Sequence, residues 1–272
     1  MPTIETNGVA THYERRGDGP PVVFVHAAML DHSQWNRQVD ALAGEFDCIT
    51  YDVRGHGHTG GSSLRSYSID LFADDLAALL DALDVERPVL CGHSTGGCVA
   101  QVYAANYPDR VAGVVLADTF APEIRGRGEW LQRSLFLRLS TYPVRLLGYQ
   151  RVERALVWLH ERLHGERVSG DYDSIRALRA DGPTMTTAEF AKVARAVASF
   201  HETAVDLSAI TAPTLVLYGA YAPAFQRAHA ATFAATIPRV EVREVPGAGH
   251  ASNLDNASFF TDAVREFASR VQ

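Results

Sequence analysis

The stretch from Pro88 to Gly97, PVLCGHSTGG, decides the fold expected for this chain. Its first half is a short apolar run typical of a buried strand, and it leads directly into a helical segment at 98–107 that Pro108 closes. Between the two lies Gly-His-Ser-Thr-Gly, which matches the pattern G-x-S-x-G. A tight turn at this point lifts the hydroxyl of Ser94 above the sheet, where the helix N-terminus favours developing negative charge. Ser94 is therefore the predicted nucleophile; the alternative is a serine that merely begins a helix.

Strand and helix signals alternate on both sides of this turn. Short β-branched or apolar runs predict strands at 11–15, 21–26, 46–52, 111–118, 213–219 and 240–246. Helical spacing of apolar residues predicts helices at 33–42, after an N-cap at Ser68, near 225–235 and from about Asn256. Such alternation requires an α/β fold, with a mostly parallel sheet covered by helices on both faces.

The pattern changes between residues 121 and 205. Apolar residues there fall at helical spacing, arginines are dense, and no strand signal occurs. We therefore expect residues 1–120 and 206–272 to form one core and residues 121–205 to form a helical insertion.

Composition excludes several classes of function. The chain has 272 residues and a formal net charge of −7, with Lys192 as its single lysine and no basic run, which argues against nucleic-acid binding. No apolar run reaches membrane-spanning length, and the N-terminal residues do not resemble a signal peptide. Three cysteines without a C-x-x-C pair indicate small buried side chains in a reducing compartment. These features predict a cytoplasmic protein, a monomer or homodimer, without nucleic-acid or membrane partners.

Three further motifs carry a resemblance to a known family. VFVHAAM at 23–29, DVRGHGHTG at 52–60 and GAGH at 247–250 resemble the oxyanion strand, the D-x-R-G-x-G loop and the histidine segment of the α/β-hydrolase fold family. Together with the serine turn, the resemblance covers nearly the whole chain. It implies a serine hydrolase similar to esterases and lactonases, with an eight-stranded, mostly parallel sheet and an inserted helical cap.

The resemblance also assigns roles to individual residues. In this family the histidine comes last in the chain, which makes His250 the expected base. The expected oxyanion donors are the backbone N–H groups of Ala28 and Thr95. Ala27 replaces the glycine usual in the family, which would cost strain if its φ angle had to be positive.

The catalytic acid is the missing part of the pattern. In this family a carboxylate usually follows the strand predicted at 213–219, but no Asp or Glu occurs from Leu207 to Val240. Some relatives, among them certain lactonases, carry their acid one strand earlier, which makes Asp118 the expected third member of the triad. Asp52, Asp206, Asp255 and a dyad without an acid remain alternatives.

The expected reaction is acyl transfer to water through an acyl-enzyme on Ser94. No cofactor is expected, since the glycine loops fit neither a dinucleotide site nor a P-loop. No metal is expected either, because the pair His56 and His58 has no evident further ligands. The substrate is expected to be an apolar ester or lactone contacted by aromatic residues, namely Trp130, Phe136, Tyr142, Trp158 and Tyr221.

Other functions fit the same sequence. A carbon–carbon bond hydrolase and a cofactor-free perhydrolase would use the same serine and histidine. A ligand-sensing protein that has lost catalysis is the alternative of a different class, and the missing acid and Ala27 favour it. Product analysis and peroxide-dependent halide oxidation distinguish the first two from an esterase.

Overall fold

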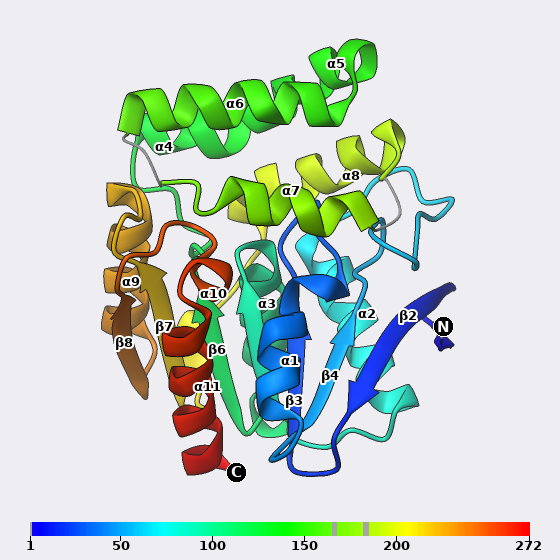
Figure 1. Cartoon of the computed structure of the whole chain (residues 1–272), viewed down its shortest axis with the longest axis vertical. Helices are drawn as coiled ribbons and strands as arrows, with labels where there is room; N and C mark the ends of the chain where they lie inside the picture. Colours follow the sequence, from blue (N-terminus) through cyan, green and yellow to red (C-terminus); the bar gives the residue numbers. More distant parts are fainter. Residues whose placement is uncertain (1, 165–167, 182–184) are drawn as a thin grey trace.

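A computed structural model describes residues 2–164, 168–181 and 185–272. An eight-stranded sheet crosses the molecule in the order β1-β2-β4-β3-β5-β6-β7-β8 (Figure 1). The first two strands pair antiparallel with their neighbours and the other six run parallel. Their bounds are β1 (Thr3–Thr6), β2 (Val9–Arg16), β3 (Pro21–Val25), β4 (Asp47–Tyr51), β5 (Val89–His93), β6 (Gly113–Ala117), β7 (Thr214–Gly219) and β8 (Val240–Val245). The α/β-hydrolase architecture is thus confirmed.

Strand β1 was not predicted, although the family resemblance implied eight strands. It has only 4 residues, and three of them are exposed or half-buried. Such an edge strand lacks the apolar run that identified the buried strands.

Both faces of the sheet are buried because successive side chains of a strand point to opposite sides. Val23 and Val25 join a core under α2 (Ile69–Ala82), α3 (Thr95–Asn106) and α9 (Ala224–Thr236). Val22 and Phe24 join a second core under α1 (Asn36–Leu42) and α11 (Ala257–Val271). This explains the uninterrupted apolar runs of the central strands. The three cysteines are free and lie buried, as expected.

Helices of the insertion cover the end of the sheet at which the parallel strands finish (Figure 1). They are α4 (Arg127–Trp130), a π-helical turn at 131–136, α5 (Leu137–Leu147), α6 (Tyr149–His164), α7 (Tyr172–Asp181) and α8 (Thr187–Ala198). All of them lie within the predicted insertion 121–205, which also contains residues outside the described ones. The boundaries of the cap as a separate unit stay a prediction. Among the described residues, no helix is both long and apolar enough to cross a membrane.

Candidate active site

The turn that carries Ser94 has an unusual backbone conformation and is flanked by glycines that have no room for a side chain. Ser94 adopts φ +51° and ψ −112° between β5 and α3, and its N–H donates to the carbonyl of Ala117 on the neighbouring β6 at 2.9 Å. A Cβ on Gly92 would lie 2.3 Å from the carbonyl oxygen of Gly96, and one on Gly96 would lie 2.1 Å from that of Val25. The two glycines therefore allow the sharp reversal that presents the Ser94 hydroxyl at the carboxyl end of β5.

His250 lies beside this hydroxyl. Its Nε2 is 3.2 Å from Oγ of Ser94, which is within reach of a hydrogen bond. The loop that carries His250 follows β8 and is held by its backbone: the N–H donates to the carbonyl of Val168 at 3.0 Å, and the carbonyl accepts from His93 at 2.6 Å. The structure thus brings together the two residues predicted as nucleophile and base.

The other ring nitrogen of His250 faces an amide. Nε2 of Gln226, on α9, is 2.6 Å from Nδ1 of His250 and also donates to the backbone carbonyl of Asp118 at 3.2 Å. Oε1 of Gln226 has no hydrogen-bond partner among the described residues, although the side chain is buried. Gln226 therefore occupies the place beside the histidine where a carboxylate was expected.

Asp118 was expected in that place, and its role as the acid of a triad stays a prediction. One carboxyl oxygen accepts from the N–H of Gly219 at 2.9 Å, and the other accepts from the N–H and the hydroxyl of Ser252. Both oxygens of the carboxyl thus accept hydrogen bonds from these two residues. Burial raises the pKa of Asp118 to about 7, although the donors from Ser252 and Gly219 favour the charged form. Asp118 thus ties β6 to β7 and to the segment just after His250.

The rival acids hold loops. Asp52 accepts from the N–H groups of His32 and His58 at 2.8 and 2.7 Å. Asp206 caps a short turn through Ser208, and Asp255 accepts from the N–H groups of Asp171 and Gly249.

His93 connects the two sides of the site. Its Nε2 donates to the carbonyl of His250, and its Nδ1 accepts from Nε2 of Gln34 at 2.8 Å. Oε1 of Gln34 in turn accepts from the N–H of Ala27 at 2.9 Å. Burial lowers the pKa of His93 to about 4, so the ring is neutral and its tautomer is set by these partners. Gln34 and His93 therefore link the oxyanion loop to the loop that carries His250 through hydrogen bonds.

Ala27, in the oxyanion loop, does not have the positive φ angle that would have strained an alanine there. The residue with positive φ is Met29, at +64°, and Ala27 is not among the residues with positive φ. Nε of Arg179, on the cap helix α7, donates to the carbonyl of Met29 at 2.9 Å. The alanine therefore fits this loop without the strain that its sequence position suggested.

A cavity of about 340 Å³ joins these groups beneath the cap. Ser94, His250 and Gln226 line it, as do Ala28 and Thr95, the two expected oxyanion donors. The cap contributes mostly apolar side chains, among them Leu137, Val157, Val168, Ile175, Ala194 and Val197. A space of this size and character suits a small organic molecule.

Comparison with known proteins shows the family of this chain. Residues 20–257 match the model of the alpha/beta hydrolase fold family. The chain belongs to this family.

Three proteins illustrate the range of relatives of this α/β hydrolase. It is similar to 3-oxoadipate enol-lactonase 2 of Acinetobacter baylyi, with 27% identity over 271 residues that cover 98% of this chain and 96% of the enol-lactonase. It is similar to the structure of a thermophilic esterase from Thermogutta terrifontis, with 29% identity, a TM-score of 0.77 and coverage of 99% and 97% of the two chains. A shorter similarity, 39% identity over 127 residues, covers 45% of this chain and 46% of a non-heme chloroperoxidase from Streptomyces lividans.

The aromatic residues expected to contact substrate lie elsewhere in this α/β hydrolase. None of the five lines the cavity, and all are exposed: Trp130, Phe136, Tyr142, Trp158 and Tyr221. The aromatic side chains that do line the cavity are Tyr172 and Phe225. The sequence pattern identified apolar cap residues but not the side of each helix that turns towards Ser94.

Gln226 is the site residue that sequence reasoning missed. It lies in the first turn of α9. This helix follows β7, the strand after which the family's acid is expected. Gln226 is the first residue after β7 whose side chain carries an amide or a charge, and this was the available signal.

Proposed function

We propose that this α/β hydrolase cleaves a carboxylic ester or lactone of a small apolar molecule through an acyl-enzyme on Ser94. The observation that carries the proposal is the pair Ser94 and His250, at 3.2 Å, at the floor of an apolar cavity of about 340 Å³. The similarity to an enol-lactonase and to an esterase supports the same reaction class.

Acylation begins when Nε2 of His250 accepts the proton of Ser94 and Oγ attacks the substrate carbonyl. The negative charge on the carbonyl oxygen is stabilised by the N–H groups of Ala28 and Thr95, which border the cavity, and by the N-terminus of α3. His250 then gives its proton to the leaving alkoxide. Water, activated by the same histidine, attacks the acyl-enzyme and frees Ser94.

Gln226 can accommodate the tautomer of the histidine that this mechanism requires. For Nε2 to accept a proton, Nδ1 must carry one, and the neighbouring group must then accept it. The Gln226 amide, turned by 180°, brings Oε1 to Nδ1 in place of Nε2. A neutral amide stabilises the imidazolium less than a carboxylate does, so the proposed rate is below that of a Ser-His-Asp triad.

Asp118 acts in this mechanism as a positioning residue. Its backbone carbonyl accepts from Gln226, and its carboxyl binds Ser252, two residues after His250. Its carboxyl therefore holds the segment just after His250, and Asp118 does not line the cavity.

The test is hydrolysis of nitrophenyl butyrate and of butyrolactone by the wild type, Ser94→Ala and His250→Ala, with circular dichroism to verify folding. Loss of the nucleophile or the base is expected to lower kcat by at least about 1,000-fold. Ser169→Ala is the matched control, because Ser169 also lines the cavity. A Ser94→Ala variant that keeps the wild-type rate would refute the mechanism.

A perhydrolase is the second candidate, and the partial similarity to a chloroperoxidase favours it. In that reaction hydrogen peroxide replaces water in attacking the acyl-enzyme and releases a peracid, which oxidises halide. Bromination of a dye that requires both peroxide and a carboxylic acid, and that is lost in Ser94→Ala, would establish this activity.

A further inference from the structure

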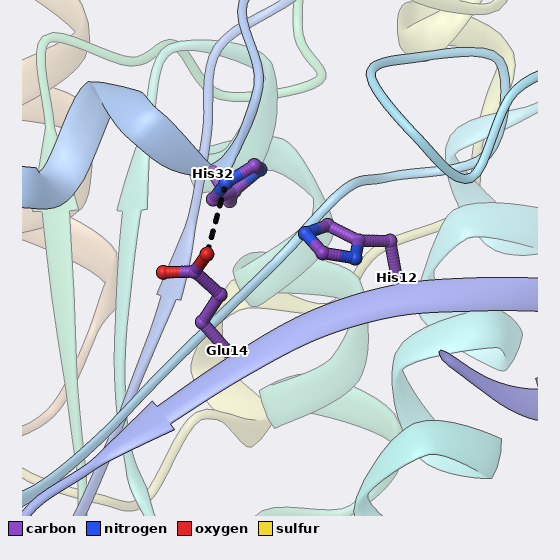
Figure 2. A group of neighbouring side chains, drawn as sticks. All are labelled: His12, Glu14 and His32. Atoms are coloured by element: carbon purple, nitrogen blue, oxygen red, sulfur yellow. Dashed lines mark ion pairs between the residues drawn. The ribbon is translucent and has the colours of Figure 1, made fainter. Parts of the chain in front are cut away.

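Two histidines and a glutamate converge outside the cavity described above. His12 and Glu14 are two residues apart on β2 and so project from the same face of that strand, and His32 begins the turn His32–Trp35 (Figure 2). None of the three lines the cavity beside Ser94. The cluster lies where the antiparallel strand β2 pairs with β4.

Both histidine rings are held through Nδ1. Nδ1 of His32 is 2.8 Å from Oδ1 of Asp52, and Nδ1 of His12 is 3.1 Å from the backbone carbonyl of Pro2. The carbonyl oxygen of Pro2 can only accept a hydrogen bond, and so can the carboxylate of Asp52 when it is ionised. Both Nδ1 atoms therefore carry a proton. When the rings are neutral, Nε2 of each carries a lone pair that can bind a metal ion. A ring held by an oxygen on one nitrogen is the usual arrangement of a histidine that binds a metal through the other.

The remaining ligand atoms point towards one another. Nε2 of His32 is 3.6 Å from Oε1 of Glu14, and one ligand atom from each of the three residues lies within 4.8 Å of the others. Metal–ligand bonds of about 2.0–2.1 Å place tetrahedral ligands roughly 3.3 Å apart, so small rotations of the side chains close the site.

Nε2 of His12 is the second, independent sign of a ligand. The residue is 0% exposed, and this nitrogen has no hydrogen-bond partner among the described residues. A buried acceptor without a partner is costly and requires an explanation. A cation bound at the cluster supplies the missing partner.

We propose that His12, His32 and Glu14 bind a divalent transition-metal ion of the zinc class, with Asp52 and the carbonyl of Pro2 orienting the two rings. Two imidazoles and one carboxylate match the ligands that zinc prefers, whereas calcium and magnesium prefer oxygen ligands alone. Three protein ligands leave one position of a tetrahedron for water or for the nearby ring of His58, whose centroid is 4.9 Å from that of His12.

Glu14 is the most exposed of the three proposed ligands. The side chain of Glu14 is 44% exposed, whereas that of His32 is 12% exposed. Glu14 is therefore the ligand that can be changed with the least effect on folding. Bound metal would tie β2 to the turn at His32–Trp35, which follows the oxyanion loop.

The experiment uses the untagged full chain after treatment with a chelator. Calorimetric titration with ZnCl2 is expected to give one site per chain, and Co²⁺ is expected to give the visible absorption of a tetrahedral site. Saturating Zn²⁺ is expected to raise the unfolding temperature by about 5 °C at a concentration near 100 times Kd. Binding in Glu14→Gln should weaken by at least about tenfold, the loss caused by removing even an outer-shell partner.

Glu5→Gln is the matched control, because Glu5 is an exposed glutamate on the adjacent strand β1. It should bind Zn²⁺ as the wild type does. His12→Gln gives a second test, and if that variant does not fold, Glu14→Gln alone decides. No binding near one equivalent overturns the proposal, as does uptake at several weak sites that Glu14→Gln leaves unchanged.

Discussion

The amide of Gln226 is the residue-scale feature that distinguishes this site. A carboxylate beside Nδ1 can only accept a hydrogen bond, so it enforces the tautomer in which Nε2 is the base. An amide can donate or accept, so it permits both tautomers. In the orientation found, Nε2 of Gln226 faces Nδ1 of His250, which favours a proton on the nitrogen next to Ser94. In the proposed mechanism the proton is on Nδ1 instead, and the amide is turned so that Oε1 of Gln226 accepts it.

Replacing this amide by a carboxylate tests the interpretation. In Gln226→Glu an anion would accept the Nδ1 proton and stabilise the imidazolium, and we expect kcat for nitrophenyl butyrate to rise by at least about tenfold. Steady-state kinetics measures the effect. Gln132→Glu is the control, since Gln132 also lines the cavity but lies in the π-helical turn of the cap rather than on α9. An unchanged or lower kcat in Gln226→Glu would count against this role of Gln226.

Asp118 makes a prediction about pH and stability. Burial raises its pKa in the folded protein to about 7, above the ordinary value of 3.8. A carboxyl with a raised folded pKa stabilises the fold below its unfolded pKa, and this stability is lost as the pH rises through the folded pKa. The free energy of unfolding of the wild type should therefore fall relative to Asp118→Asn, by up to about 4 kcal/mol, between about pH 4 and pH 8.

Chemical denaturation at several pH values measures the difference in free energy of unfolding between the wild type and Asp118→Asn. The contributions of other titrating groups are the same in both proteins and cancel in this difference. Asparagine also accepts the positive φ of +45° found at Asp118, so the variant should fold. A difference in the free energy of unfolding that does not depend on pH would show that Asp118 is ionised throughout this range.

Sequence reasoning succeeded at residues whose roles depend on local patterns. The pattern around Ser94 lies between one strand and one helix, and GAGH follows the last strand, so both could be placed without tertiary information. The partner of Nδ1 depends on how α9 packs against β7 and β8, which the local sequence does not encode. For the same reason the amino-acid type of Asp118 was informative, but the direction of its carboxyl was not.

At the scale of elements, the cap is joined to the loop of the histidine. The carbonyl of Val168 accepts from the N–H of His250, and the N–H of Asp171 donates to Asp255 at 2.6 Å. Gly170, between them, has φ +82°, and a Cβ there would lie 2.8 Å from Cβ of Ala251. The cap segment 168–171 and the loop after β8 therefore form one packed unit.

Gly170→Ala should displace this unit. Alanine would face both the strained φ and the contact with Ala251, so we expect roughly 1–2 kcal/mol of destabilisation and about a tenfold loss in kcat/KM. Gly148→Ala is the matched control, because Gly148 has a similar φ of +79° but a Cβ there would have nothing within 4 Å. It should lose stability and keep kcat/KM. Equal catalytic losses in both variants would contradict a specific role of the segment.

The cap was predicted as helical because its apolar periodicity is long and uninterrupted by strand signals. Its contacts were not predictable, because amphipathic helices such as α5 and α6 show which residues share a face but not what that face meets. Leu137 turns towards the cavity, whereas its neighbour Phe136 is 58% exposed.

At the scale of the whole molecule, the sheet and the cap border a cavity whose volume limits the size of the substrate. A cavity of about 340 Å³ lies at the small end of the range for ligand sites. The expected substrates are accordingly short.

Acyl-chain length provides the corresponding test. We expect kcat/KM to fall at least about tenfold from nitrophenyl butyrate to nitrophenyl laurate, because the longer chain exceeds the enclosed space. Ile175→Ala, which removes side-chain atoms from the lining, should reduce that preference, whereas Leu178→Ala on the same helix should not, because Leu178 is not a lining residue. A preference for laurate in the wild type would mean that the cap opens far more widely than in this structure.

Ser94, activated by His250, is the proposed nucleophile of this α/β hydrolase. Covalent labelling by a nitrophenyl alkylphosphonate, followed by intact mass measurement and peptide mapping, tests this assignment most directly. We predict one phosphonyl group per chain, on Ser94, with labelling slowed by at least about 100-fold in His250→Ala. A label on another residue, or labelling of His250→Ala at the wild-type rate, would contradict the account.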